Sequence, residues 1–280
     1  MKLGEVRGST RVAALGDSGT GKTRLVGLLC ALVPTVVVTA DPEGLDTLVG
    51  MGAIPAEVVL LQDWDNIWDY HGAILASLKN GAKAVALDDF GAAQREMRRK
   101  IELQARSFSE EKLATPAREE MIRQQLLQGD RKLLLQHYGE LAGAAENWLY
   151  EFIRLPAPLK LMTMLTEVRD NPRSGEDYLF PNLMGNIRYD ILALFSLVLN
   201  TFIAYREGKA HFAITSRPHP RIATKDRYGV PRTWAGDFRD PTMERIYLHI
   251  LRQEGDSDRE TALELAIGVG LEDKAKGVTT

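Results

Sequence analysis

A glycine-rich segment near the start of the chain has the residue types and spacing of a phosphate-binding loop: Gly16, Asp17, Ser18, Gly19, Thr20, Gly21, Lys22 and Thr23. The glycines allow the backbone to curve so that its N–H groups point at phosphate oxygens. Lys22 can reach the β- and γ-phosphates of a nucleotide, and the Thr23 hydroxyl can bind Mg²⁺. The segment therefore predicts a site for ATP and Mg²⁺, and Arg24 is the last residue that we assign to it.

The residues on both sides of this loop predict the elements that must hold it. Val12, Ala13, Ala14 and Leu15 form an apolar run typical of a buried strand, and residues 24–32 have the pattern of a helix. A strand, a glycine loop and a helix in this order are the context that the motif requires. The N-terminus of the helix adds a partial positive charge that favours phosphate.

Two carboxylates follow a second apolar run, residues 84–87. Asp88 can hold Mg²⁺ through water beside Thr23, as a strand-end carboxylate does in related chemistry. Asp89 is the neighbouring candidate, but side chains alternate along a strand, so both are not expected to face one ion. The alternative role for an aspartate at this place is to cap the N-terminus of a helix.

A third acidic position follows the β-branched run at residues 35–40, where Asp41-Pro42-Glu43 ends the predicted strand. Strand ends at this edge of an open α/β sheet line the ligand crevice. A carboxylate there can orient water for attack on the γ-phosphate. We favour Glu43 for this role because the turn at Pro42 can occupy Asp41, and ordinary turn chemistry is the alternative for both.

Two cations lie far downstream, in the segment that runs from Lys225 through Asp226 and Arg227 to Gly229. On an extended strand, residues two apart point to the same side. Lys225 and Arg227 can therefore clamp a γ-phosphate together, and a neighbouring subunit could supply them as an arginine finger. The composition of this segment also fits an ordinary surface turn.

The first ninety residues alternate between strand and helix patterns. A short helix is predicted at 44–51, a strand at 57–62 and a helix at 66–80. Such alternation predicts an α/β fold with a mostly parallel central sheet flanked by helices. After the helical stretch that follows, we expect a strand at 159–167, a polar loop at 168–184, a hairpin turn at 207–209 and a strand at 211–215.

Residues 92–150 lack strand signal and predict a helical insertion into this core. Arg95, Arg98, Arg99 and Lys100 make it locally basic, which fits either a solvated helix face or a contact with nucleic acid or another subunit. We therefore divide the chain into a core at 1–91 and 151–240, the insertion at 92–150, and a C-terminal helix and tail at 241–280.

Composition narrows the classes of protein that fit. The chain has 280 residues, 45% of them hydrophobic, and a net charge of −3, so no global basic field favours nucleic acid. Cys30 is the single cysteine and cannot form an internal disulfide, which fits a reducing cytosol. No apolar stretch has the length needed to span a bilayer. We expect a cytoplasmic protein without a membrane partner.

Together these motifs resemble the core of RecA-type recombinases and hexameric helicases. The nearest resemblance is to small RecA-like P-loop ATPases of phages, including Sak-type single-strand annealing proteins. The segment 39–44 resembles the Asp-x-Glu of that family, whose glutamate activates water, and this implies the catalytic role of Glu43. The segment 87–90 resembles the second nucleotide motif, which implies that Asp88 contacts the metal.

The same resemblance implies roles for residues after position 160. Segment 163–167 corresponds to a strand that ends in a polar γ-phosphate sensor, a role for which Thr166 and Glu167 are both candidates. The loop at 168–184 corresponds to a DNA-binding loop, which implies DNA contacts from Arg169, Arg173 and Arg188. Lys225 and Arg227 resemble a Lys-x-Arg pair that related proteins insert across subunit boundaries.

The function that the resemblance implies is an ATP-dependent recombinase or annealing protein that binds single-stranded DNA. It implies a DNA-stimulated ATPase with ATP between the subunits of a homo-oligomeric ring or filament. A phage single-strand-binding protein would be a further partner, in the cytoplasm of a bacterial host. Two other functions stay open: an ATPase acting as a helicase loader or packaging-type motor, and a small-molecule kinase of the phosphate-loop superfamily.

Overall fold

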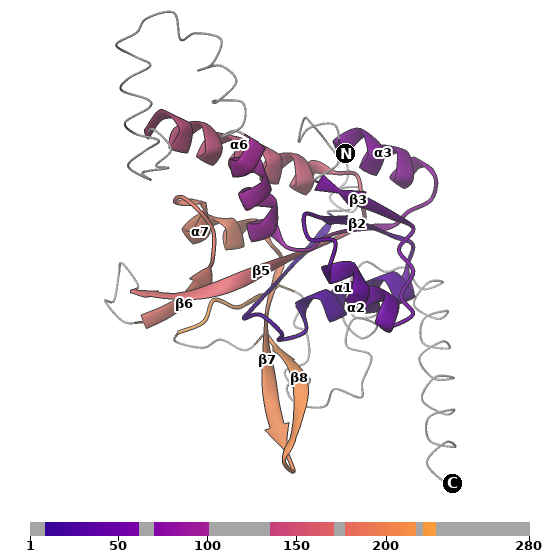
Figure 1. Cartoon of the computed structure of the whole chain (residues 1–280), viewed down its shortest axis with the longest axis vertical. Coiled ribbons are helices and arrows are strands. Elements are labelled where there is room, and N and C mark those ends of the chain that lie inside the picture. The colour runs from indigo at the N-terminus through magenta and orange to yellow at the C-terminus, as the bar shows by residue number, and fades with distance from the viewer. Residues whose placement is uncertain (1–8, 62–69, 101–134, 171–176, 217–220, 228–280) are drawn as a thin grey trace, which may run out of the picture.

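One sheet of nine strands organises the part of the chain that this computed structural model describes, which is residues 9–61, 70–100, 135–170, 177–216 and 221–227 (Figure 1). Its main path is β3-β2-β4-β5-β1-β7-β8, with β6 paired to β5 and β9 paired to β7. The strands are β1 (Thr10–Gly16), β2 (Thr35–Thr39), β3 (Glu57–Leu60), β4 (Ala84–Leu87), β5 (Leu159–Asp170), β6 (Asp177–Pro181), β7 (Leu197–Arg206), β8 (Lys209–Thr215) and β9 (Lys225–Asp226).

The six strands from β3 to β7 along this path all run parallel, and only β6, β8 and β9 pair antiparallel. A parallel sheet needs crossover helices, and these cover both faces. The helices are α1 (Lys22–Leu32), α2 (Gly44–Gly50), α3 (Tyr70–Lys79), a helical stretch at 90–100, α6 (Leu135–Arg154), α7 (Ile187–Asp190) and the 3₁₀ turn η3 (Ile191–Leu194). The predicted α/β fold with a mostly parallel sheet is therefore confirmed.

The alternation of side chains along β1 divides the core into two layers. Val12 and Ala14 face α1, where Leu25 and Leu29 pack against them. Ala13 and Leu15 face the opposite layer, which is built from α3, α6 and the helix at 90–100. Because residues 12–15 of β1 are buried on both faces of the sheet, this run is continuously apolar rather than alternating.

The described part of the predicted insertion packs directly on this sheet. Trp148 of α6 is fully buried and stacks with the rings of Tyr70, Phe90 and Phe152 at centroid distances of 5.2, 5.6 and 5.9 Å. Helical structure is present at 90–100 and in α6, which ends at Arg154. The division of the chain into core, insertion and tail stays a prediction, and the C-terminal helix and tail predicted at 241–280 lie outside the described residues.

The polar loop that we predicted at 168–184 is wrong for residues 168–170 and 177–181, which form strands, whereas residues 182–184 lie in a loop. β5 continues to Asp170 and pairs with β6, from Thr166 opposite Pro181 to Asp170 opposite Asp177. This ribbon extends past the core (Figure 1), and residues 168–170 and Asp177 are exposed, which is why this part of the sequence resembles a loop. Tyr178, Leu179 and Phe180 of β6 are partly buried. The hairpin turn predicted near 207–209 is confirmed, since Arg206 of β7 pairs with Lys209 of β8.

No helix among those described combines the length and the apolar character needed to cross a membrane.

Candidate functional site

A cavity of about 380 Å³ opens at the carboxyl ends of the parallel strands. Its walls come from the loop between β1 and α1, the ends of β2 and β4, the first turns of the helix at 90–100, and Leu165 of β5. Phe212 of β8 completes the wall. The predicted phosphate-binding loop therefore borders a cavity at the strand ends, where open α/β sheets bind ligands.

The glycines of the loop are required by its geometry at two places. Gly21 has a φ of 92°, a left-handed conformation that side chains rarely adopt. Gly16 packs too closely against β7 for a side chain, because a Cβ at this position would lie 2.1 Å from Thr201 Oγ1 and 2.6 Å from Thr201 O. Thr201 also supports the loop through its hydroxyl, which donates to Leu15 O at 3.0 Å and lies 2.7 Å from Thr20 Oγ1.

The Lys22 side chain binds carbonyl oxygens of its own loop in this conformation. Its ammonium donates to Gly16 O at 2.9 Å and to Asp17 O at 2.7 Å. Burial lowers the pKa of Lys22, and the carboxylates of Asp89, Asp88 and Asp17 oppose that shift. The cation thus lies at the rim of the loop, in reach of any anion that enters it.

Asp88 lies where a divalent ion beside Thr23 would require it. Its Oδ1 accepts a hydrogen bond of 2.6 Å from the Thr163 hydroxyl, and Thr23 also donates to its carboxylate. Burial raises the pKa of Asp88, while the two hydroxyls and the charge of Lys22 act in the other direction. A nearby cation would hold this carboxylate in its ionised form.

Asp89 has a structural role in this arrangement. Its Oδ1 accepts the N–H of Ala92 at 2.7 Å, and its Oδ2 accepts the N–H of Leu165 at 3.0 Å. The first bond caps the helix that begins at residue 90. The cap role that we considered for Asp88 therefore belongs to its neighbour. Both aspartates border the cavity, and the expectation that only one of them faces a metal ion stays a prediction.

Asp41, and not Glu43, borders the cavity. Its Oδ1 accepts the Glu43 N–H at 3.1 Å, which is the turn contact that we expected to occupy it. Its Oδ2 stays available: an ideal Cβ on Gly44 would be 3.8 Å from that oxygen and 3.9 Å from Asp88 Oδ2. Both carboxylates thus face the same small space, whereas Glu43 lies at the start of α2 and is exposed outside the cavity wall.

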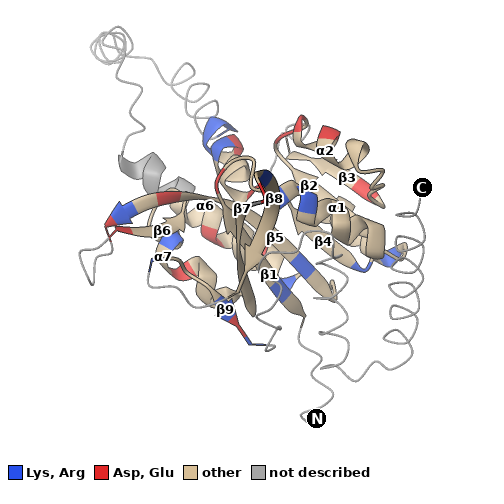
Figure 2. Ribbon diagram, turned by 90° about the horizontal axis from the view of Figure 1, so that it is seen from below, with Lys and Arg blue, Asp and Glu red and all other residues tan. Residues whose placement is uncertain are grey.

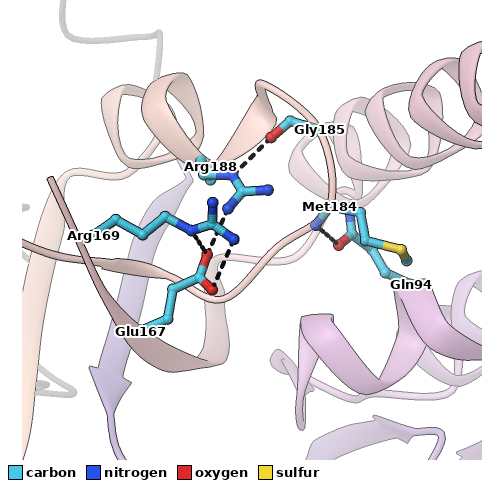
Figure 3. Close-up of polar contacts among 6 residues, drawn as sticks. All are labelled: Gln94, Glu167, Arg169, Met184, Gly185 and Arg188. Atoms are coloured by element: carbon cyan, nitrogen blue, oxygen red, sulfur yellow. Dashed lines mark hydrogen bonds and ion pairs between the residues drawn. The ribbon is translucent and has the colours of Figure 1, made fainter. Parts of the chain in front are cut away.

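Thr166 and Glu167, the two candidates for the γ-phosphate sensor, point in different directions. The Thr166 hydroxyl donates to Asp17 Oδ1 at 2.6 Å and so contacts the phosphate-binding loop. Glu167 instead accepts bonds from Arg169 at 2.6 Å and from Arg188 at 2.5 Å (Figure 3). Consecutive strand residues point to opposite faces, so of these two candidates Thr166 is the one that contacts the phosphate-binding loop.

The predicted DNA contacts fall on the β5–β6 ribbon and on α7. Arg169 is 47% exposed, while Arg188 is only 12% exposed and also donates to Gly185 O at 2.9 Å. Figure 3 shows both guanidinium groups directed at Glu167. In this conformation Arg188 helps to hold α7 against the ribbon, and Arg169 is the more accessible cation. Arg173 lies outside the described residues.

Lys225 and Arg227 do not border the cavity of their own chain. β9 pairs with the start of β7, where Val198 lies opposite Lys225 and also opposite Ala13 of β1. That is about 10 Å along β1 from Gly16, at 3.3 Å per residue. The Lys225 ammonium donates to Ala193 O at 2.9 Å.

These two cations belong to a larger group that we call the cation row, which consists of Arg11, Lys160, Lys225 and Arg227. Lys160 lies opposite Arg11 in the β5–β1 pair, Ser196 N–H donates to Arg11 O, and Arg227 N–H donates to Ser196 O. Residues in register on neighbouring strands project to the same face. In Figure 2, β1 and β9 lie near each other and both carry blue Lys or Arg residues.

Electrostatic effects within the cation row agree with this placement. Burial and the charge of Arg11 lower the pKa of Lys160 to about 8. Burial and the charges of Arg227 and Arg11 lower the pKa of Lys225. The Arg11 Nε atom is buried and has no hydrogen-bond partner among the described residues. The row therefore concentrates positive charge at the end of the sheet away from the phosphate-binding loop.

The residues at the cavity fit a magnesium–triphosphate group. Backbone N–H groups, a helix N-terminus and the Lys22 ammonium suit phosphate oxygens. The Thr23 hydroxyl and the Asp88 carboxylate are the oxygen donors that Mg²⁺ prefers. The described residues contain no group of three or more His, Cys, Asp or Glu side chains arranged to hold a metal by themselves.

Sequence analysis missed four contributors to this site: Thr163, Thr201, Phe212 and, as a residue of the cavity wall, Arg95. Each lies on an element that only tertiary structure brings to the loop. No local pattern marks a threonine in a buried strand as a partner of an aspartate 75 positions away.

Comparison with known proteins gives a limited result. No protein-family model matches the chain, and no curated protein sequence matches it. Among solved structures, the crystal structure of a KaiC-like protein from the hyperthermophilic archaeon Pyrococcus horikoshii aligns with 78% of this chain and 81% of that chain. The aligned residues are 15% identical, and the TM-score is 0.33.

Proposed function

We propose that this chain is an ATPase of RecA type that binds Mg²⁺–ATP between subunits and acts on single-stranded DNA. One observation carries the nucleotide part of the proposal. Lys22, Asp88 with its Thr23 and Thr163 hydroxyls, and Asp41 all converge on a single cavity next to a glycine loop. These are the parts that phosphoryl transfer uses for positioning and charge stabilisation.

Each residue has a distinct role in this proposal. Lys22 and the loop N–H groups hold the β- and γ-phosphates, while Thr23 and Asp88 hold Mg²⁺, whose charge offsets that of the phosphates. Asp41 orients the water that attacks the γ-phosphorus and takes its proton, as the bond to the ADP oxygen breaks. We assign this role to Asp41 rather than to Glu43 because only Asp41 faces the cavity.

The shared-site part of the proposal rests on the cation row. Lys225 and Arg227 are too far along the sheet to border their own cavity. Burial lowers the pKa of Lys225, and the charges of Arg227 and Arg11 lower it further. Within the cation row, the partly exposed Lys225 and the exposed Arg227 form a positive surface, which favours an anionic partner. In an oligomer, the triphosphate of the adjacent subunit is the anion that this surface would contact.

The DNA part of the proposal rests on the β5–β6 ribbon. Thr166 contacts Asp17 in the phosphate-binding loop, and the next residue, Glu167, binds Arg169 and Arg188. A change in the loop on nucleotide binding would therefore act on the residues next to these arginines. This arrangement supports coupling between nucleotide and DNA, and the phage origin and annealing activity stay predictions of the resemblance.

Two measurements on the purified chain test these parts separately. ATP hydrolysis is measured with and without single-stranded oligonucleotide, and oligonucleotide binding is followed by gel shift at low salt. We expect stimulation of hydrolysis and a shift that weakens as salt increases. Absence of both would refute the DNA part and leave the nucleotide part in place.

Mixing inactive variants tests the shared site. Lys22→Ala lacks the phosphate-binding cation, and Arg227→Ala lacks the proposed cation in trans. If sites lie between subunits, mixtures of the two regain activity, because some interfaces join an intact loop to an intact Arg227. Arg154→Ala, which removes an exposed arginine of α6, is the matched control and should stay fully active alone. No recovery would indicate a self-contained site, as in a kinase.

A further inference from the structure

We propose that Phe212 and Arg24 form the nucleobase subsite of the cavity, in which the Phe212 ring stacks on the base. The inference rests on the proposed function, since it assumes that a nucleoside triphosphate occupies the phosphate-binding loop. It adds a residue from the β7–β8 hairpin that the motifs of the sequence do not include.

Phe212 lies against the phosphate-binding loop although it is almost two hundred residues away in the sequence. A Cβ on Gly21 would be only 2.9 Å from Phe212 Cδ1 and 3.2 Å from its Cγ. Phe212 also borders the same cavity as Lys22 and Thr23. The ring is therefore held at the start of α1, next to the place where the phosphates would lie.

One face of this ring is in contact with a planar cation. The Arg24 guanidinium carbon lies 5.5 Å from the centroid of the Phe212 ring, within the range of a cation–π contact. Phe212 is nevertheless 39% exposed, so part of its side chain is accessible to a ligand. A partly exposed ring beside a planar cation is a surface that suits a flat, aromatic ligand group.

The order of residues in the loop indicates which end of the nucleotide reaches this ring. Lys22 and Asp88 mark the phosphate and metal end, and Arg24 and Phe212 border the cavity at the start of α1. The volume of about 380 Å³ is within the range of small-molecule sites, so the cavity can hold more than phosphates. Stacking on an aromatic ring recognises any base, because every base has a π-face.

Binding of ATP and of inorganic tripolyphosphate to the full chain separates this subsite from the phosphate site. Both ligands are titrated calorimetrically in Mg²⁺ against the native chain, Phe212→Ala, Phe212→Trp and Tyr205→Ala. Phe212→Ala should weaken ATP binding by about 5- to 100-fold, from the usual contribution of one stacked base. It should leave tripolyphosphate binding unchanged, and Phe212→Trp should keep native ATP binding.

Tyr205→Ala is the matched control, because Tyr205 lies on the same hairpin, is 78% exposed and does not border the cavity. It should bind both ligands as the native chain does. Equal weakening of ATP and tripolyphosphate by Phe212→Ala would mean that the ring only supports Gly21, and it would overturn the inference. Unchanged ATP binding would overturn it as well. If the native chain binds neither ligand, the proposed function itself fails; if it binds both equally well, only the base subsite fails.

Discussion

The hydrogen bond from Thr163 to Asp88 offers a sharp test of the metal site. Thr163 is fully buried on β5, and its hydroxyl donates to Asp88 Oδ1 at 2.6 Å. Burial already raises the pKa of Asp88, and this hydroxyl opposes the shift. Thr163→Val keeps the shape of the side chain and removes the donor. The carboxylate should then bind a divalent cation less well, because it loses both its orientation and part of the stabilisation of its charge.

The size of the effect follows from the type of bond. A hydrogen bond to a charged group is worth about 1.5–3 kcal/mol, and loss of a hydrogen bond that orients a metal ligand costs about 10- to 100-fold in metal affinity. ATP binding is therefore measured by calorimetry over a series of Mg²⁺ concentrations and again in EDTA. We expect the Mg²⁺ dependence of Thr163→Val to shift to concentrations about 10- to 100-fold higher. Binding of metal-free ATP should not change.

Thr35→Val is the matched control. Thr35 is also fully buried on a central strand, but its hydroxyl donates to Val33 O at 2.8 Å, away from the cavity. This variant should lose some stability and keep the native dependence on Mg²⁺. If Thr163→Val showed the same Mg²⁺ dependence as the native chain, Asp88 would not be the metal-binding carboxylate, and the arrangement proposed for this site would be incorrect.

Three further changes test other parts of the site and fold. Asp41→Asn should reduce the rate of ATP hydrolysis by about 100-fold or more with little change in ATP affinity, as expected for loss of a general base. Glu43→Gln should hydrolyse ATP normally. A slow Glu43→Gln variant beside a normal Asp41→Asn variant would show that Glu43 is the base. Arg95→Ala removes a cation of the cavity wall and should lower the preference for ATP over ADP in binding assays. The control is Arg99→Ala on the same helix, where Arg99 pairs with Glu96, and this variant should keep the native preference for ATP. Folding lowers the pKa of Lys160 from 10.5 to about 8, so the unfolded chain binds more protons than the native chain between these pH values. The free energy of unfolding, measured in urea, should therefore rise by about 3 kcal/mol from pH 8 to 10.5. Lys160→Met should lack that rise.

Local sequence is sufficient to predict those parts of the protein that depend on residues close together along the chain. The strand, loop and helix around Lys22 are correct because apolar periodicity and glycine spacing act within a few residues. The parallel α/β class followed from the same local alternation. The turn before Lys209 was equally predictable, because glycine is the residue that readily adopts a positive φ in a turn. The structure places Gly208 at a φ of 74°.

Tertiary structure alone decided which side chains meet at the cavity. Asp41 and Glu43 are two positions apart, and only the orientation of the turn places one of them in the wall and the other outside. Phe212 reaches the loop because β7 pairs with β1 and β8 folds back on β7. Strand order depends on contacts between residues far apart in sequence, and no local spacing encodes it. The cation row, which joins Arg11 to Arg227 across the sheet, exists for the same reason.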